Sequence, residues 1–389
     1  MTKTNVLSRV QKYTMVLILI LVVLFFTWGT KGSLLLPQNI TNIIAQNAYV
    51  FVLTVGMLLC ILTGGNIDLS VGSVVCFVGA LGATFMAKGL NMWAAVGIML
   101  VTGIVIGAWQ GFWIAYVHVP PFIVTLAGMM IFRGLSNVVL DGKTVSVTNE
   151  AFVRIFGGGA NCYLADPFGG KGINILCLIV GGAVCLIYLF SVFRGRIQRK
   201  KKGLDLEPAV SAVFKTAVIL AAIVFFTISL SRYKGVPTAL IWVAAVILIY
   251  SYLTSKTTIG RHFYAVGGNE KATKLSGIDT NRVYFVAYTN MGLLAALAGM
   301  LTIARMTSAQ PTYGQNYEMD AIGSCFIGGA SAYGGIGTVP GVIIGAVLMG
   351  VINIGMSIMG VDANYQKVVK GAVLLAAVIF DVVSKREKS

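Results

Sequence analysis

The sequence predicts an all-α membrane protein that crosses the bilayer many times. Of the 389 residues, 57% are hydrophobic and only 11% are charged, and the mean hydropathy is +0.86. Soluble domains carry about twice that share of charge. Apolar stretches of the ~20 residues that a transmembrane helix needs recur along the chain, with short polar gaps between them. The gaps leave no room for a soluble domain, so we expect residues 1–389 to form a single transmembrane domain.

Twelve apolar segments are candidate spans. The first follows Lys3, Arg9 and Lys12, a layout shared with signal peptides, but no small-residue cleavage site follows, so we interpret it as an uncleaved span. The segment at 321–338 is the weakest, because it is rich in glycine, and a broken or re-entrant helix is the alternative there. The candidates are residues 14–30, 47–63, 71–87, 93–117, 122–140, 173–193, 212–230, 237–253, 283–303, 321–338, 339–359 and 367–383.

The net charge of +16 indicates topology rather than nucleic-acid binding, because the basic residues lie in gaps between apolar runs. Cytoplasmic loops hold an excess of Lys and Arg. Twelve crossings place the four most basic segments on one side, whereas a re-entrant 321–338 would separate the tail from the others. We therefore predict that both termini and the loops 194–208 and 254–282 face the cytoplasm. The basic residues concerned are Lys3, Arg9, Lys12, Arg194, Arg196, Arg199, Lys200, Lys201, Lys202, Lys256, Arg261, Lys271, Lys274, Arg282, Lys385, Arg386 and Lys388.

Two parts of the chain, residues 47–140 and 283–383, resemble each other, and residues 173–253 lie between them as inserted spans and a basic loop. By the span count the two parts enter the membrane from opposite sides, which would make an inverted repeat of the kind that transporters use. A likeness of glycine-rich helices by composition alone is the alternative. The matching residues are Gly103, Gly107 and Ala108 with Gly341, Gly345 and Ala346, and Asp68, Gly72 and Ser73 with Asp320, Gly323 and Ser324.

The sequence contains no pattern that favours catalysis, a metal or a nucleotide. With two histidines and no carboxylate or thiolate cluster at ligand spacing, we predict no catalytic residue, no metal site and no cofactor bound by this chain. Residues 142–144 resemble the end of a phosphate-binding loop, but Asn137 stands where that loop needs glycine.

Polar groups inside a membrane are costly and are therefore candidates for lining a solute path. Asp68 lies in the stretch GGNIDLS between two spans, where capping the next helix is the alternative role. Arg133 could snorkel or pair internally, and Asp320 could be solvated at a membrane interface. The candidates for the translocation path are Asn66, Asp68, Ser70 and Asn353.

The cytoplasmic loop TTIGRHFYAVGGNEKATKLSGIDTNRV is too long for a turn and too apolar for a tether. It could form a short helix on the membrane surface that offers a face to a partner, or an interfacial helix packed only on its own protein. Gly267 and Gly268 would permit a tight bend that a Cβ would obstruct, and Asn269 would cap the following helix. Glu270 with two lysines would present charge to the partner.

The stretch GRHFYAVGGNEKATKLSGI closely resembles the cytoplasmic coupling loop of ABC importer permeases that serve ribose, galactose and xylose systems. GGNIDLSVGSVV, VPPFIVTLAGMMIFRGL and GGIGTVPGVIIGAVLMGVINIGM resemble other motifs of that family, in the same order. An additional stretch at 191–252 departs from the ribose pattern and resembles the xylose and multiple-monosaccharide branch. The resemblance implies a type II-like ABC importer permease of 10 to 12 helices in a bacterial inner membrane.

The same resemblance implies partners: a separate ATPase subunit that binds ATP, a second permease copy in a homodimer, and an extracytoplasmic binding protein that delivers the sugar. The coupling residues that it implies are Gly260, Arg261, Tyr264, Ala265, Gly267, Gly268, Asn269, Ala272, Lys274, Ser276, Gly277 and Ile278. Two other classes are weighed against it. A secondary transporter or channel would place coupling-ion carboxylates at mid-membrane, where Asp68 is the one fair candidate, and an intramembrane enzyme would need a catalytic constellation.

Overall fold

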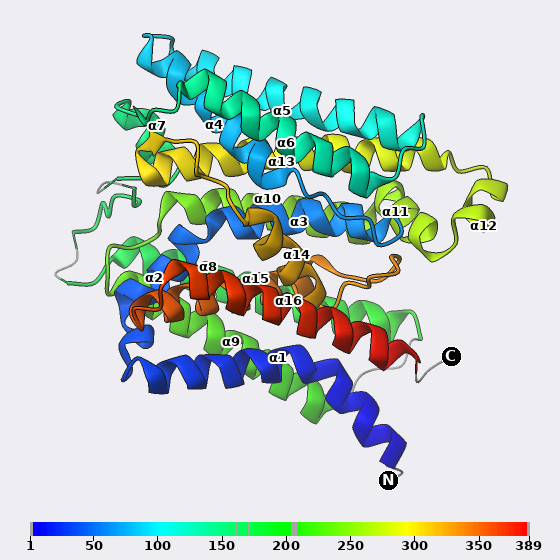
Figure 1. The fold of residues 1–389 in the computed structure, drawn as a ribbon. Helices are drawn as coiled ribbons and strands as arrows, with labels where there is room; N and C mark the ends of the chain where they lie inside the picture. The colour runs from blue at the N-terminus through cyan, green and yellow to red at the C-terminus, as the bar shows by residue number, and fades with distance from the viewer. Residues whose placement is uncertain (1–2, 160–161, 170–171, 204–207, 387–389) are drawn as a thin grey trace. The chain divides into compact units, whose positions relative to one another are not determined.

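The computed structural model describes residues 3–159, 162–169, 172–203 and 208–386, and these parts are almost entirely helical (Figure 1). Two short strands, β1 (Val145–Ser146) and β2 (Ser308–Ala309), pair antiparallel. The helices are α1 (Lys3–Gly29), α2 (Pro37–Gln46), α3 (Ala48–Leu62), α4 (Val71–Ala87), α5 (Met92–Ala115), α6 (Pro121–Leu140), α7 (Glu150–Ile155), α8 (Ile175–Lys201), α9 (Ala209–Ser231), α10 (Thr238–Lys256), α11 (Thr258–Gly268), α12 (Glu270–Leu275), α13 (Thr280–Met306), α14 (Tyr317–Ile327), α15 (Val339–Ile358) and α16 (Ala363–Arg386), with a 3-10 turn at Ser33–Leu35.

The chain divides into two compact units. Unit 1 comprises residues 1–34, 43–162 and 238–389, and unit 2 comprises residues 35–42 and 163–237. In unit 2, α8 packs along α9. The hairpin is closed where the Asn174 amide donates to the Ser231 carbonyl at 2.9 Å. Gly181 allows close packing there, since a Cβ on it would lie 2.2 Å from the Thr227 side chain.

The core of unit 1 is built around α3 and α13. Fourteen of the residues of α3, from Ala48 to Leu62, are buried, and 78% of the apolar stretch of α13 is buried. A helix that is apolar on every side belongs in an interior. α13 packs on α5, α3 and α4, while α14 packs on α15, α3 and α16. The lipid-facing helices are thus arranged around two helices that lipid hardly touches.

Glycines allow α5 and α13 to pack backbone against backbone. A Cβ on Gly103 would lie 2.5 Å from the Gly292 carbonyl oxygen, and one on Gly107 would lie 2.4 Å from the Tyr288 carbonyl oxygen. Small residues at a four-residue spacing permit this approach between membrane helices. Gly103 and Gly107 therefore lie on the face of α5 that contacts α13.

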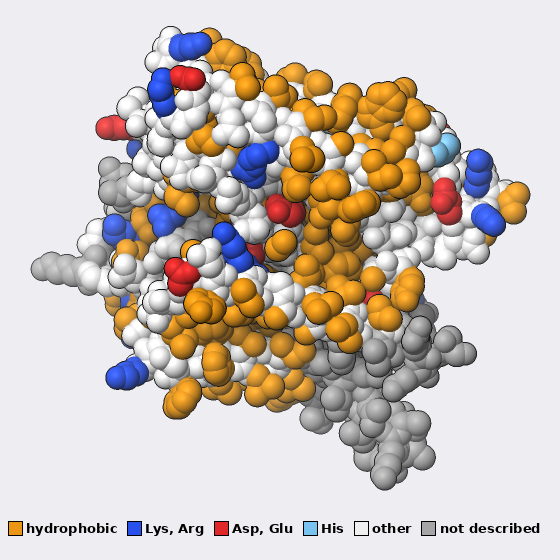
Figure 2. All heavy atoms as spheres, viewed as in Figure 1, with side chains coloured by type: hydrophobic (Ala, Val, Ile, Leu, Met, Phe, Trp, Pro, Cys, Tyr) orange, Lys and Arg blue, Asp and Glu red, His pale blue; other side chains and the backbone are white. Residues whose placement is uncertain are grey.

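The surface confirms a multi-pass membrane protein. Large hydrophobic side chains are exposed along the helices, for example Val138 at 75% and Leu248 at 71%, and Figure 2 shows hydrophobic side chains spread widely over one face. Seven helices among the described residues are long and apolar enough to cross a membrane, or eight if α2 and α3 count as one bent span. The seven are α5, α6, α8, α9, α10, α13 and α15. Twelve crossings and the inverted repeat stay predictions.

Eleven of the twelve candidate spans coincide with helices, whereas 321–338 is not one continuous helix but the broken helix that was the alternative for it. α14 ends at Ile327, and the next helix begins only at Val339. Gly329, Gly334 and Gly335 between them adopt positive φ, which a continuing α-helix excludes. The eleven residues of α14 span ~16 Å, about half of a hydrocarbon core. The non-helical segment 328–338 is allowed because protein covers most of it.

Within unit 1, the start of α1, the end of α16 and the α11–α12 segment lie toward the same end of the helices, at the right of Figure 1. α7 lies at the opposite end. The segment 328–338 reaches the α11 end, where the Gly335 amide donates to the Leu62 carbonyl at 3.1 Å. The chain therefore still passes from one end of unit 1 to the other between α13 and α15, through a half-length helix and an extended segment.

The α5–α13 contact predicts a sharp difference between two glycines of α5. Gly107→Val should lower the free energy of unfolding by about 1–3 kcal/mol, because the added side chain meets the α13 backbone. Gly97→Val is the matched control, since a Cβ on Gly97 meets nothing within 4 Å. Thermal unfolding of the detergent-purified chain measures both. Equal melting temperatures for the two variants would contradict this packing.

Candidate functional site

The segment from Thr257 to Ile278 forms two short helices, and the sequence explains where each begins. The Thr257 hydroxyl accepts from the Gly260 amide at 3.1 Å and starts α11. The Asn269 side chain accepts from the Ala272 amide at 2.9 Å and starts α12. The predicted cap at Asn269 is therefore confirmed. Side-chain oxygens at these positions satisfy helix amides that otherwise lack partners.

α11 is fastened to two other parts of unit 1. A Cβ on Gly267 would lie 1.8 Å from the Leu62 carbonyl oxygen, at the end of α3. The Tyr264 hydroxyl donates to the Gly337 carbonyl at 2.8 Å. Burial raises the pKa of the Tyr264 phenol above its ordinary value, so the hydroxyl keeps the proton that it donates. Any displacement of α11 must therefore move the end of α3 and the segment 331–337.

Gly268 corrects one expectation. A Cβ at this position would meet nothing within 4 Å, and its φ is not positive. Glycine is therefore needed at Gly267, where α11 packs closely on the backbones of Leu62 and Gly335 and does not bend, and it is not needed at Gly268. The reason is the neighbour: Gly267 faces a backbone, whereas Gly268 is exposed.

α12 presents an open face. Ala272, Lys274 and Ser276 are exposed, and Leu275 is 90% exposed, more than any other exposed hydrophobic side chain described. Gly277 adopts a φ of 82° that turns the chain back toward α13. A groove of about 570 Å³ beside it is lined by residues of α11, of α13 and of the turn between α12 and α13, which include His262, Arg282 and Ile278 respectively. Of the other predicted coupling residues, Arg261 is exposed, Ala265 is half-buried, and Gly260 packs on the α10 backbone.

Two non-helical segments, residues 63–70 and 331–337, cross each other near α11. A Cβ on Gly65 would lie 1.9 Å from the Ala332 carbonyl oxygen, and one on Gly334 would lie 2.4 Å from the Gly64 Cα. The backbones of residues 63–70 and 331–337 are thus in direct contact. The first segment leads from α3 into α4 and contains three of the path candidates.

Asp68 and Ser70 form a buried polar cluster at the start of α4. Asp68 is 2% exposed, and its Oδ1 accepts from the Ser70 amide at 2.8 Å and from the Ser70 hydroxyl at 2.6 Å. The Gln110 side chain of α5 donates to the Ser70 hydroxyl at 2.7 Å. Asp68 therefore orders the turn before α4, but it does not cap the helix, because the N-cap position belongs to Ser70 and Asp68 accepts from no amide of α4 itself. Asn66 is half-buried and donates to the Thr63 carbonyl at 3.2 Å.

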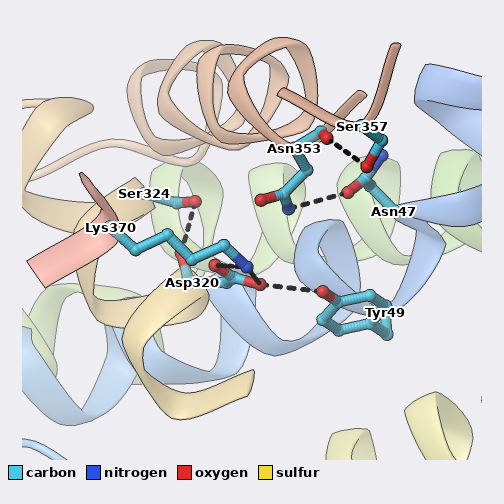
Figure 3. A network of polar contacts seen from close by, with 7 residues as sticks. All are labelled: Asn47, Tyr49, Asp320, Ser324, Asn353, Ser357 and Lys370. Atoms are coloured by element: carbon cyan, nitrogen blue, oxygen red, sulfur yellow. Dashed lines mark hydrogen bonds and ion pairs between the residues drawn. The ribbon is translucent and has the colours of Figure 1, made fainter. Parts of the chain in front are cut away.

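A second network, drawn in Figure 3, contains a buried ion pair. Lys370 Nζ of α16 lies 2.9 Å from Asp320 Oδ1 of α14, and the Tyr49 hydroxyl of α3 donates to Asp320 Oδ2 at 2.8 Å. The Tyr49 ring stacks on Tyr317 with the ring centroids 3.6 Å apart. Asp320 is 1% exposed, so its expected solvation at an interface is wrong. The paired lysine explains how a carboxylate can lie there.

Asn353, the remaining path candidate, belongs to the same region. Its side-chain amide donates to the Asn47 side-chain oxygen at 3.0 Å, which joins α15 to the start of α3. The Ser357 hydroxyl donates to the Asn353 carbonyl at 2.9 Å (Figure 3). Neither of these hydrogen bonds involves a residue of the Asp68 cluster, so Asn353 is not connected to that cluster.

Arg133 pairs internally, which was one of the two roles considered. Its Nη1 donates to the carbonyls of Pro311 and Tyr313, at 2.9 and 2.6 Å, in the segment between β2 and α14. Sequence reasoning missed Lys370 and Gln110, although a charged or amide side chain inside a long apolar stretch is a usable signal. In the part of the chain that the structure describes, no three His, Cys, Asp or Glu side chains meet as a metal site requires.

Comparison with known proteins supports a transport function. The family model described as "Branched-chain amino acid transport system / permease component" matches residues 39–378. The xylose transport system permease protein XylH of Escherichia coli K12 is 38% identical over 97% of this chain and 93% of its own length. XylH of Haemophilus influenzae is 36% identical over 97% and 98%, and the ribose import permease protein RbsC of E. coli K12 is 34% identical over 94% and 92%. No solved structure matches.

The buried ion pair predicts an asymmetry between single and double substitutions. Lys370→Met should lower the free energy of unfolding by about 3–5 kcal/mol, because it leaves the Asp320 carboxylate buried without a cation. Adding Asp320→Asn in the same chain should restore most of that loss, since neither charge then remains. Thermal unfolding in detergent tests both variants. A double variant that is less stable than Lys370→Met would show that the pair is not coupled.

Proposed function

Because the chain belongs to the family of branched-chain amino acid transport system permease components, we propose that it is the membrane-spanning subunit of an ATP-dependent importer for monosaccharides. The names of the relatives support a sugar rather than an amino acid, since those with the highest identities above are xylose and ribose permeases. ATP is hydrolysed on a separate ATPase subunit. An extracytoplasmic binding protein delivers the sugar, and two permease copies form the path.

The observation that carries this proposal is the contact of α11 with the end of α3 and with the non-helical segment 331–337. An ATPase that moves α12 moves α11, because a single residue, Asn269, joins them. α11 contacts the end of α3 through Gly267 and the segment 331–337 through Tyr264. Movement at the cytoplasmic surface thus reaches the turn that holds Asp68 without crossing any flexible linker.

The path is proposed to include the polar groups of that turn and, apart from it, Asn353 of α15. A sugar crossing a membrane needs hydrogen-bond partners for its hydroxyls, because unpaired polar groups are costly in an apolar medium. Four residues supply such groups at breaks or polar contacts of the helices: Asn66 and Asn353 supply amides, Asp68 a carboxylate and Ser70 a hydroxyl. Their role in selecting the sugar is a proposal that substitutions such as Asn66→Ala, assayed for uptake, can test.

A self-sufficient secondary transporter is the second candidate, and the Asp320–Lys370 pair favours it. Buried charges in membrane helices often serve ion coupling. The two candidates differ in one measurement: proteoliposomes that contain this chain alone should not accumulate sugar down an ion gradient if the ATPase is required.

The membrane orientation predicts a labelling pattern in the bacterial inner membrane. A membrane-impermeant maleimide added outside intact cells should label Lys143→Cys and not Leu275→Cys or Ser389→Cys. Lys143 and Leu275 are both exposed, whereas Ser389, Lys388 and residues 204–207 of the basic loop lie outside the described residues. Permeabilised cells should show labelling at all three positions. Labelling of Leu275→Cys from outside would place the coupling segment on the wrong side.

The coupling role predicts different defects for three substitutions. Gly267→Ala should lower ATP-driven uptake at least about tenfold, equivalent to ~1.4 kcal/mol, because the Cβ pushes α11 off α3, while the ATPase stays bound. Gly268→Ala, the matched control, should transport normally. Ala272→Glu, on the open face of α12, should release the ATPase. Proteoliposome uptake, co-purification and the permease stoichiometry of the complex measure these outcomes.

Normal uptake by Gly267→Ala, with the ATPase still bound, would make α11 a spacer and contradict the mechanism. A functional complex with one permease copy would contradict the homodimer.

A further inference from the structure

Unit 2 contains a pocket that has no part in the mechanism proposed above. It lies between α8 and α9 and has a volume of about 210 Å³. Arg196 and Arg199 of α8 and Lys215 of α9 line it, together with the hydroxyl-bearing side chains Tyr188, Ser191 and Thr216. Three cationic groups and three hydroxyl groups thus meet in a space large enough for a phosphate with a small substituent.

The pocket lies where α8 changes from apolar to basic. Residues 175–193 of α8 carry no charge, whereas residues 194–202 carry six basic side chains. Neither α8 nor α9 contains an acidic residue, and no ion pair is formed by the three lining cations within the described part of unit 2. Asp205 and Glu207 of the connecting loop lie outside the described residues, and the segment 194–208 is net positive even with both counted.

Apolar surface adjoins the basic pocket. Phe190 and Phe193 on α8 are 63% and 66% exposed, and Phe214 on α9 is 71% exposed. Only 11% of the apolar stretch of either helix is buried within the structure. A ligand held by the cations would therefore have hydrocarbon-compatible surface directly beside it.

We propose that this pocket binds the headgroup of an anionic phospholipid, with the acyl chains along α8 and α9. Arginine binds phosphate oxygens through two parallel N–H groups, and basic residues at the cytoplasmic end of membrane helices attract anionic lipids. The position of the pocket at the apolar–basic boundary matches the level of a phosphate headgroup. A free anion would leave the aromatic surface unused, and an apolar helix of another protein would leave three cations unpaired.

The test compares two triple variants with equal loss of charge. Native mass spectrometry of the full chain in detergent, titrated with phosphatidylglycerol or phosphatidylcholine, measures lipid binding without any ATPase, so its result is independent of the proposed transport function. Arg196→Gln, Arg199→Gln and Lys215→Gln together should weaken phosphatidylglycerol binding by about 100-fold. Arg194→Gln, Lys200→Gln and Lys201→Gln, which are exposed and outside the pocket, should change it by less than about threefold.

Four results would overturn the proposal. Equal losses in the two triple variants would mean diffuse charge without a site. If phosphatidylcholine bound as strongly as phosphatidylglycerol, the pocket would not recognise the negative charge of the headgroup. Displacement of the lipid by millimolar inorganic phosphate would indicate a free-anion site. Disulfide cross-linking of Ser191→Cys between copies would put a second chain there. If the first triple variant unfolds, Arg196→Gln against Arg194→Gln makes the same comparison.

Discussion

Every break in a helix inside a membrane must be covered by protein, and unit 1 depends on this constraint. Its two non-helical segments, 63–70 and 328–338, would leave backbone amides and carbonyls unpaired in lipid. They instead contact each other through Gly64 and Gly65 on one side and Ala332 and Gly334 on the other. The helices that lead into these segments, α3 and α14, are accordingly buried along most of their length.

The same constraint explains how charge is distributed. Asp320 is tolerated because Lys370 and Tyr49 meet both of its oxygens, and Arg133 is tolerated because it satisfies two carbonyls of the irregular segment before α14. These side chains bind the short helix α14 and the irregular segment before it to neighbouring helices, in addition to hydrophobic packing. Removing one partner is therefore expected to cost more than removing both, since an orphaned charge is the expensive state.

Much of the helical framework could be predicted from sequence, because lipid imposes length and hydropathy on each span. Eleven of the twelve segments coincide with helices. The Asn269 cap could be predicted because it involves only the Asn269 side chain and an amide three residues further along the chain. The errors have a common cause. Gly267 and Gly268 look alike in sequence and differ only in what α3 places opposite them, and Asp320 is buried only because α16 brings Lys370 to it. Local signals predict elements, while the partner across a contact depends on tertiary packing.

The path residues show where this limit affects function. The sequence left Asp68 open between a cap and a lining residue, and in the structure its Oδ1 accepts from the amide and the hydroxyl of Ser70, the residue that precedes α4. The Ser70 hydroxyl also receives Gln110 from α5. A shift of the 63–70 segment by α11 would therefore alter this hydrogen-bond chain before it altered any helix. The hydrogen bonds by which Asp68 orders this turn would thus make Asp68 respond to the proposed movement of α11.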